Sequence, residues 1–164
     1  MGTFRDFYNS EEKREVLSVI VVNKDSVLSR IVDLFSARGY NIDSLTVAPI
    51  PNSEYSRITI VTFGKTRTID QIVKQLNLIP VFKVMEHKDV IEKDTVLVKI
   101  PLDQSLSDVD VLARAYNGAI QNVTENAIVV SATDEPKRIE NFLKAIKRYN
   151  PKEIVRSGAV ALER

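Results

Sequence analysis

The stretch Asn23-Lys-Asp-Ser-Val-Leu-Ser-Arg-Ile-Val-Asp-Leu-Phe-Ser-Ala-Arg-Gly-Tyr-Asn-Ile-Asp-Ser-Leu-Thr-Val47 decides the fold of this chain. It follows residues 16–22, an almost wholly apolar run that predicts a strand buried on both faces or against a neighbour. A polar loop over 23–25, a helix over 26–38 and a strand over 42–48 come next. The sequence therefore predicts a strand, a loop, a helix and a second strand in succession.

The helix is indicated by its periodicity and by residues suited to its two ends. Asp25 or Ser26 can accept a hydrogen bond from the unpaired amides of the first turn. Gly39 can adopt the left-handed conformation that closes a helix. The apolar face, which we expect in the core, recurs at i, i+3, i+4 and i+7 and consists of Leu28, Ile31, Val32 and Phe35.

The start of this helix is a candidate ligand site. A helix start carries unpaired amides and a partial positive charge, which suit a carboxylate or a phosphate. Asn23 and Asn41 can each donate and accept hydrogen bonds, as an amino-acid ligand with a carboxylate and an ammonium group requires. Residue chemistry alone leaves a plainer alternative open, in which Asn23 and Asp25 cap the helix and Asn41 turns a loop.

Residues 55–88 predict two further strands and a helix between them. The strands are expected over 55–63 and 81–87. Thr68-Ile-Asp-Gln71 fits a capping box at the start of the helix, and Pro80 ends that region. The order of elements is βαββαβ, which predicts an antiparallel sheet with both helices on one face.

The same order of elements is predicted again in the second half of the chain. The expected strands lie over 95–100, 119–124, 127–132 and 154–162. Ser107 can cap the helix after the first strand and Gly118 can end it. Asp134 and Pro136 mark the start of the last helix, because proline fits the first helical turn.

These patterns indicate an α+β fold with two ferredoxin-like βαββαβ domains, the second a structural repeat of the first. The expected organisation is a flexible N-terminal extension over 1–14, a first domain over 15–88, a charged linker over 89–94 and a second domain over 95–164. Each domain alone buries a modest core, so packing of the two, or pairing of sheets across a dimer, would add stability.

Composition excludes several classes of protein. Basic and acidic residues number 23 and 22, so bulk charge predicts no nucleic-acid or membrane partner. The chain has no cysteine, and no apolar run approaches the ~20 residues of a membrane helix. His87 is the single histidine, Ser29 has no neighbouring base, and Gly64-Lys65 lacks the spacing of a nucleotide loop. We expect a soluble, cytoplasmic protein with neither catalytic residues nor a metal site.

The quoted stretch also carries a family resemblance. Leu17-Ser-Val-Ile-Val-Val-Asn23, Leu28-Ser-Arg30 and Leu34-Phe-Ser-Ala-Arg-Gly-Tyr-Asn-Ile-Asp-Ser-Leu-Thr-Val47 closely resemble the small, regulatory subunit of acetohydroxyacid synthase, also called acetolactate synthase. The resemblance continues through Ser56-Arg-Ile-Thr59 and Leu97-Val-Lys-Ile100 to Arg156-Ser-Gly158, so it extends from about Glu15 to the C-terminus.

The resemblance implies an N-terminal ACT domain, a C-terminal ferredoxin-like domain and a non-catalytic function. Such a subunit forms a homodimer through its ACT domains, binds and activates the catalytic (large) subunit, and confers feedback inhibition by a branched-chain amino acid, usually valine. Thiamine diphosphate, FAD and Mg are expected only in the catalytic subunit, and no cofactor in this chain. The ligand would lie between two ACT domains, at a site composed of Asn23, Lys24, Asp25, Ser26, Val27, Leu28, Ser29, and Asn41 and Ile42 of the partner chain.

This sequence departs from the ACT pattern at the helix start. ACT domains usually carry glycine where this chain has Ser26, and Val27 is bulkier than the small residue often found there. Two alternatives to the regulatory subunit therefore stay open: a free-standing ACT-type amino-acid sensor, and a dimerisation module with a degenerate ligand site. The absence of a basic recognition helix argues against a sensor that controls transcription.

Overall fold

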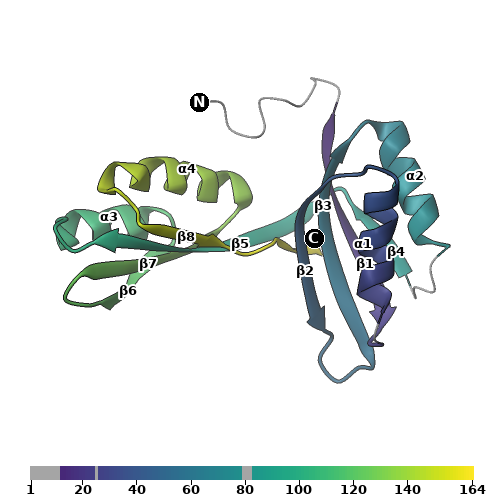
Figure 1. Ribbon diagram of the computed structural model, residues 1–164, viewed down its shortest axis with the longest axis horizontal. Helices are drawn as coiled ribbons and strands as arrows, with labels where there is room; N and C mark the ends of the chain where they lie inside the picture. The colour runs from purple at the N-terminus through teal and green to yellow at the C-terminus, as the bar shows by residue number, and fades with distance from the viewer. Residues whose placement is uncertain (1–11, 25, 79–82) are drawn as a thin grey trace. The chain divides into compact units, whose positions relative to one another are not determined.

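A computed structural model describes residues 12–24, 26–78 and 83–164 of the chain. The described residues divide into two compact units, one ending at Asp89 and the other running from Val90 to Leu162 (Figure 1). The predicted roles of the segment 1–11, of Asp25 as a cap and of Pro80 as a terminator lie outside the described residues.

The first unit contains two helices on one face of a four-stranded sheet (Figure 1). Its elements are β1 (Lys13–Val22), α1 (Val27–Ala37), β2 (Ile42–Pro49), β3 (Tyr55–Gly64), α2 (Thr66–Leu76) and β4 (Lys83–His87). The strand order is β2-β3-β1-β4, and every neighbouring pair is antiparallel. The predicted ferredoxin-like βαββαβ arrangement is therefore confirmed.

Strand β1 is the central buried element of this unit. Leu17, Val19 and Val21 belong to the core beneath the helices. Ser18 and Ile20, which alternate with them and so point to the opposite face, are also buried. The apolar run in the sequence thus did predict a strand that is buried on both faces.

The predicted core face of α1 is only half right. Ile31 and Phe35 are buried together with Val27, which the periodicity had not included. Leu28 and Val32 are instead 40% and 38% exposed. The buried stripe follows the i, i+4, i+8 positions, and Leu28 and Val32 lie one position further round the helix. They form a second apolar stripe that remains open to solvent.

The predicted caps of α2 and α3 are wrong because these helices begin earlier than expected, and of the two caps predicted for α1 only Ser26 is described. Ser26 is the N-cap residue of α1, but its side chain makes no capping hydrogen bond. Helix α2 begins after Lys65, so Thr68 lies inside the helix and forms no capping box. Helix α3 is capped by Ser105 rather than Ser107, since the amide of Asp108 donates to Ser105 Oγ at 3.4 Å.

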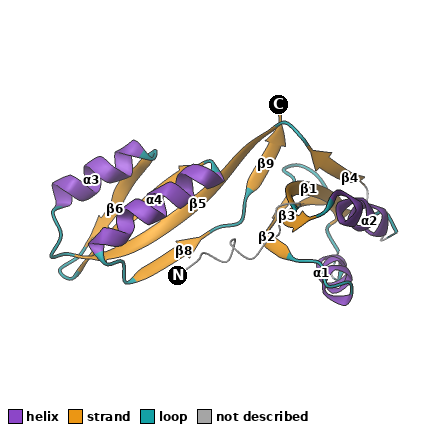
Figure 2. Cartoon of the chain, turned by 90° about the horizontal axis from the view of Figure 1, so that it is seen from above, coloured by secondary structure: helices purple, strands orange, loops and turns teal. Residues whose placement is uncertain are grey.

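The second unit repeats the topology of the first, as predicted (Figure 2). Its elements are β5 (Val90–Pro101), α3 (Leu106–Ala115), β6 (Gly118–Val123), β7 (Ala127–Asp134), α4 (Pro136–Ile146), the short 3-10 helix η2 (Lys147–Tyr149), β8 (Glu153–Arg156) and β9 (Val160–Glu163). The strand order is β6-β7-β5-β8, and β9 also pairs with β5. Pro136 occupies the first turn of α4, as expected.

The charged segment predicted as a linker is largely a strand. Residues 90–94 form the first part of β5, and the acidic side chains of Glu92 and Asp94 are buried there. Arg156 Nε donates to Asp94 Oδ2 at 2.9 Å, and this ion pair offsets the cost of burying the Asp94 carboxylate. Similarly, Lys13 and Arg14 belong to β1 rather than to the N-terminal extension. Charged residues thus belong to strands in both places, and those of β5 are buried.

The end of α3 also differs from the prediction. The left-handed residue is Asn117, with φ of 56°, and not the glycine that follows it. Gly118 begins β6, where a Cβ atom would lie 2.3 Å from the carbonyl oxygen of Ser131 on β7. Glycine is needed here for the close approach of two strands, not to end the helix.

Candidate functional site

The start of α1 presents backbone donors on the surface of the first unit. The amides of Val27, Leu28 and Ser29 lie in the first turn, where no intrahelical acceptor exists. The helical ladder begins with the amide of Arg30, which donates to the carbonyl oxygen of Ser26 at 3.1 Å. Leu28 and Ser29 are exposed. Unpaired first-turn amides of this kind suit an anion, and the ligand site predicted from the sequence stays a prediction.

The loop before α1 offers side chains rather than backbone donors. The amide of Asn23 donates to the carbonyl oxygen of Glu54 at 2.9 Å, and that of Lys24 donates to the carbonyl oxygen of Val22 at 2.7 Å. Both amides are thus used within the chain. The side chains of Asn23 and Lys24 are exposed and border the helix start. Asp25 lies outside the described residues.

Ser26 has a backbone conformation that favours glycine. Its φ is 76° and its ψ is −13°, in the left-handed region. An L-residue with a Cβ atom is strained there, whereas glycine is not. The frequent glycine of ACT domains at this position thus has a conformational reason as well as a steric one. Ser26 retains the backbone turn that points the first-turn amides outward.

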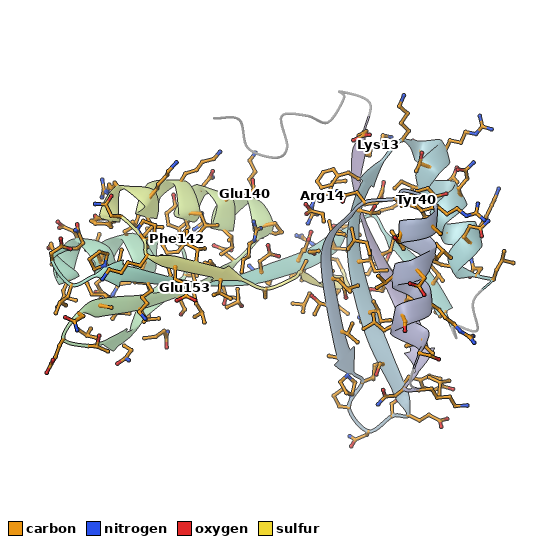
Figure 3. All side chains as sticks on the ribbon, viewed as in Figure 1. Lys13, Arg14, Tyr40, Glu140, Phe142 and Glu153 are labelled. Carbon is orange, nitrogen blue, oxygen red and sulfur yellow. The ribbon has the colours of Figure 1, made fainter. Side chains whose placement is uncertain are left out.

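Asn41 is held at the opposite end of α1. Gly39, with φ of 66°, turns the chain after the helix, as predicted. The amide of Tyr40 donates to the carbonyl oxygen of Phe35 at 2.9 Å, and the two rings meet edge to face with centroids 6.1 Å apart. Figure 3 labels Tyr40 near Lys13, at the end of the unit where β1 begins. This packing fixes the chain immediately before Asn41.

Sequence reasoning missed Thr62, a fully buried residue of β3. Its hydroxyl donates to the carbonyl oxygen of Asn41 at 2.5 Å. The signal available in the sequence was a threonine at the position that continues the apolar face of Ile58 and Ile60. Such a residue needs a partner when it is buried, and Asn41 is that partner.

One copy of the chain does not bring the two parts of the predicted site together. Ile42 pairs with Thr62, and Thr62 pairs with Glu15 near the start of β1. Asn23 follows Val22, at the other end of the same strand. About eight residues of β1 separate the level of Asn41 from that of Asn23, and this corresponds to roughly 25 Å. A single small ligand cannot span that distance, so Asn41 and the helix start of the same chain cannot both contact one ligand.

Exposed apolar side chains lie along the elements beside this site. Leu28 and Val32 lie on α1, and Val47, which is 43% exposed, lies on β2. Strand β2 is an edge strand of its sheet, so one row of its backbone groups has no neighbouring strand among the described residues of this unit. An apolar helix stripe and an open strand edge are typical of a surface that another molecule covers.

The second unit contains a buried carboxylate with a different role. Asp134, which is 2% exposed, accepts hydrogen bonds from Lys93 Nζ, Asn117 Nδ2, the amide of Glu135 and Arg138 Nε. Burial alone would raise the pKa of Asp134, but the hydrogen bonds from Arg138, Glu135 and Lys93 outweigh it and lower the pKa to about 2. The group is fully paired, so it stabilises the unit and is not a ligand site.

The described residues contain neither a metal site nor a membrane-spanning helix. Across 12–24, 26–78 and 83–164, no cluster of three or more His, Asp or Glu side chains could hold a metal ion. No helix among these described segments is long and apolar enough to cross a membrane. His87 lies at the end of β4.

Comparisons with known proteins identify the family of this chain. A family model described as an AHAS small subunit-like ACT domain matches residues 17–83, and one described as the small subunit of acetolactate synthase matches residues 93–164. The acetolactate synthase small subunit of Buchnera aphidicola subsp. Schizaphis graminum is 37% identical over 158 residues, 92% of this chain and 99% of the relative. The chain belongs to the family of acetolactate synthase small subunits.

Other small subunits of acetolactate synthase support the same assignment. The one from Haemophilus influenzae is 37% identical over 156 residues, which cover 92% of this chain and 96% of the relative. The crystal structure of the small subunit from Thermotoga maritima superposes with a TM-score of 0.85 at 29% identity, covering 93% of this chain and 98% of that one. The chain is thus a regulatory, non-catalytic subunit, and the family resemblance is confirmed.

Proposed function

We propose that this small subunit binds and activates the acetolactate synthase catalytic subunit and makes it sensitive to feedback inhibition by valine. The observation that carries the proposal is the exposed start of α1, whose first-turn amides follow the left-handed residue Ser26. The catalytic subunit would carry thiamine diphosphate, FAD and Mg, and this chain would carry the amino-acid ligand. Branched-chain ligands suit the site because Leu28 and Ile42 are apolar and partly accessible.

The ligand site is completed by a second copy of the chain. Two β2 edges that pair antiparallel about a two-fold axis place the start of one strand beside the end of the other. Asn41 precedes β2, while the end of β2 pairs at the level of Ser56, close to Asn23. The partner's Asn41 then approaches the helix start of the first chain. The same pairing covers Val47 and the exposed stripe of α1.

Valine regulates in this arrangement by binding one form of the dimer better than another. A ligand with equal affinity for both forms would shift nothing, however tightly it bound. Valine bridges the helix start of one chain and the Asn41 of the other, so its binding energy depends on the angle between the two ACT domains. The catalytic subunit responds to that angle.

The test is the activity of the cognate catalytic subunit with and without this chain over a valine titration, together with calorimetry of valine with the chain alone. We expect activation by the chain, loss of that activation with valine, and weaker effects of leucine and isoleucine. Valine binding without any effect on the synthase would identify a free-standing sensor. The absence of heat and of a melting shift at millimolar valine would identify a dimerisation module with a degenerate site.

Replacement of Ser26 by glycine tests how closely valine approaches the helix start. Ser26→Gly removes the strain of a left-handed L-residue, about 1–2 kcal/mol, against a glycine entropy cost of about 0.5–1 kcal/mol. We expect a melting temperature that is unchanged or slightly raised, and tighter valine binding because the side chain no longer crowds the ligand. Calorimetry and thermal unfolding measure the two effects.

A matched control is available in the second unit. Asn150 is another left-handed non-glycine residue, with φ of 52°. Asn150→Gly should leave valine binding unaltered, and it should raise the melting temperature less than Ser26→Gly because asparagine tolerates the left-handed conformation better than serine. Valine binding that is weaker in Ser26→Gly than in the wild type would show that serine is part of the site rather than an obstruction in it.

A further inference from the structure

Strand pairing alone does not hold Asn41 in place. In the ladder between β2 and β3, the register shifts between Ile42 and Ser44, so Asp43 is an extra residue. Ile42 pairs with Thr62 and is the first paired residue of β2, so Asn41 lies beyond the end of the ladder. The hydroxyl of Thr62 holds the Asn41 carbonyl group at this point beyond the ladder.

Thr62 is built into the sheet firmly enough to be that anchor. It pairs with Glu15 on β1 and with Ile42 on β2, so neighbouring strands hold it on both sides. Its side chain is completely buried, on the face of β3 that Ile58 and Ile60 also occupy. Its hydroxyl donates to the Asn41 carbonyl oxygen at 2.5 Å, beyond the last strand pair.

We propose that Thr62 is a positioning residue of the amino-acid site, which acts through the backbone of Asn41 and thereby sets the response to ligand. The inference rests on the proposed function, because it concerns the same site. Thr62 is buried beneath Asn41 and does not touch the ligand. Tyr40 fixes the chain on one side of Asn41 and Thr62 holds its carbonyl group, so the backbone from which the exposed side chain reaches the partner's helix start is held in one position.

Thr62→Val is the informative substitution, because valine has nearly the same shape and lacks the hydroxyl. Asn41 is exposed, so its carbonyl oxygen can turn to water when the hydroxyl is lost. We expect the valine concentration for half-inhibition of the reconstituted synthase to rise roughly 3- to 10-fold, the effect of losing one neutral hydrogen bond. Activation of the catalytic subunit without valine should stay at the wild-type level.

Thr59→Val is the matched control. Thr59 is also a buried threonine of β3, 3% exposed, but it pairs with Thr46 in the regular part of the ladder and faces the other side of the sheet. It should leave the half-inhibiting valine concentration unchanged. Thr62→Ser keeps the hydroxyl and should restore a near wild-type response. If packing mattered and the hydroxyl did not, Thr62→Val would instead keep the wild-type response and Thr62→Ser, which lacks a methyl group, would be the impaired variant.

The outcomes separate this inference from the proposed function. A wild-type complex whose activity does not change with valine overturns both the proposed function and the role of Thr62. A wild-type complex that responds to valine, with Thr62→Val responding at the same concentration, overturns the role of Thr62 and leaves the proposed function standing. A shift in Thr62→Val that persists on the Asn41→Ala background also overturns it, because the effect must travel through Asn41. Support requires the shift in Thr62→Val, its rescue by serine and its absence in Thr59→Val.

Discussion

The Asn41→His variant is expected to activate the synthase but no longer to make it sensitive to inhibition by valine. The amide of Asn41 would hydrogen-bond a ligand held by the other chain, and loss of such a bond at a buried polar site costs about 1–3 kcal/mol. That cost corresponds to a roughly ten- to hundredfold loss of affinity. The fold should survive because Asn41 is exposed and precedes β2. Synthase activity over a valine titration is the measurement.

Ser29→Phe should have the same effect from the other side of the site. Ser29 is exposed on the first turn of α1, so a phenyl ring there would occupy the space in front of the free amides. Activation should again be retained. If either variant remains fully sensitive to valine, the site is wrongly placed. If either also loses activation, sensing and activation share one surface, and the dimer-angle mechanism is wrong.

A mixture of the two variants tests whether two chains share one site. In a mixed dimer, the intact helix start of the Asn41→His chain meets the intact asparagine of the Ser29→Phe chain. One of the two sites is then complete, so mixing and exchange of subunits should restore part of the valine response. Were both residues contributed by a single chain, no mixture could restore it. The separation of roughly 25 Å between them predicts restoration.

The fold could be predicted from the sequence because the spacing of apolar residues distinguished its helices from its strands. Runs of buried β-branched residues marked β1 and β5, and Gly39 marked the end of α1. The sequence could not show which apolar residues meet the core and which meet a partner. Leu28 has the same chemistry as Ile31, and only the position of the sheet beneath α1 separates them.

The candidate site was predictable as a set of residues but not as an arrangement. The helix start and Asn41 are eighteen or fewer residues apart in the chain, yet they lie at opposite ends of a strand ladder. The left-handed backbone of Ser26 and the hydroxyl of Thr62 beneath Asn41 depend on three-dimensional context. Residue types indicate a chemistry, whereas the distances between them depend on strand register.

The buried carboxylate of Asp134, at the end of β7, connects several elements of the second unit. Its hydrogen bonds reach Lys93 on β5, Asn117 in the turn between α3 and β6, and Arg138 on α4. The pKa of this group falls from 3.8 to about 2 on folding, so the carboxylate stabilises the folded state above pH 3.8. A shift of this size is on the order of 2 kcal/mol, which is lost progressively as the pH falls through this interval.

Asp134→Asn should therefore destabilise the second unit by about 2 kcal/mol at pH 7, and by progressively less as the pH falls toward 2. The amide keeps the size of the side chain but removes the charge that Lys93 and Arg138 require. Calorimetric unfolding, with hydrogen exchange of β7 and α4, measures the loss at each pH. Asp110→Asn is the control, because its ion pair with Arg114 lies on the surface and is worth about 0.3–0.5 kcal/mol. Equal destabilisation of Asp134→Asn at pH 7 and pH 2 would contradict the electrostatic account, since only the ionised carboxylate stabilises the fold.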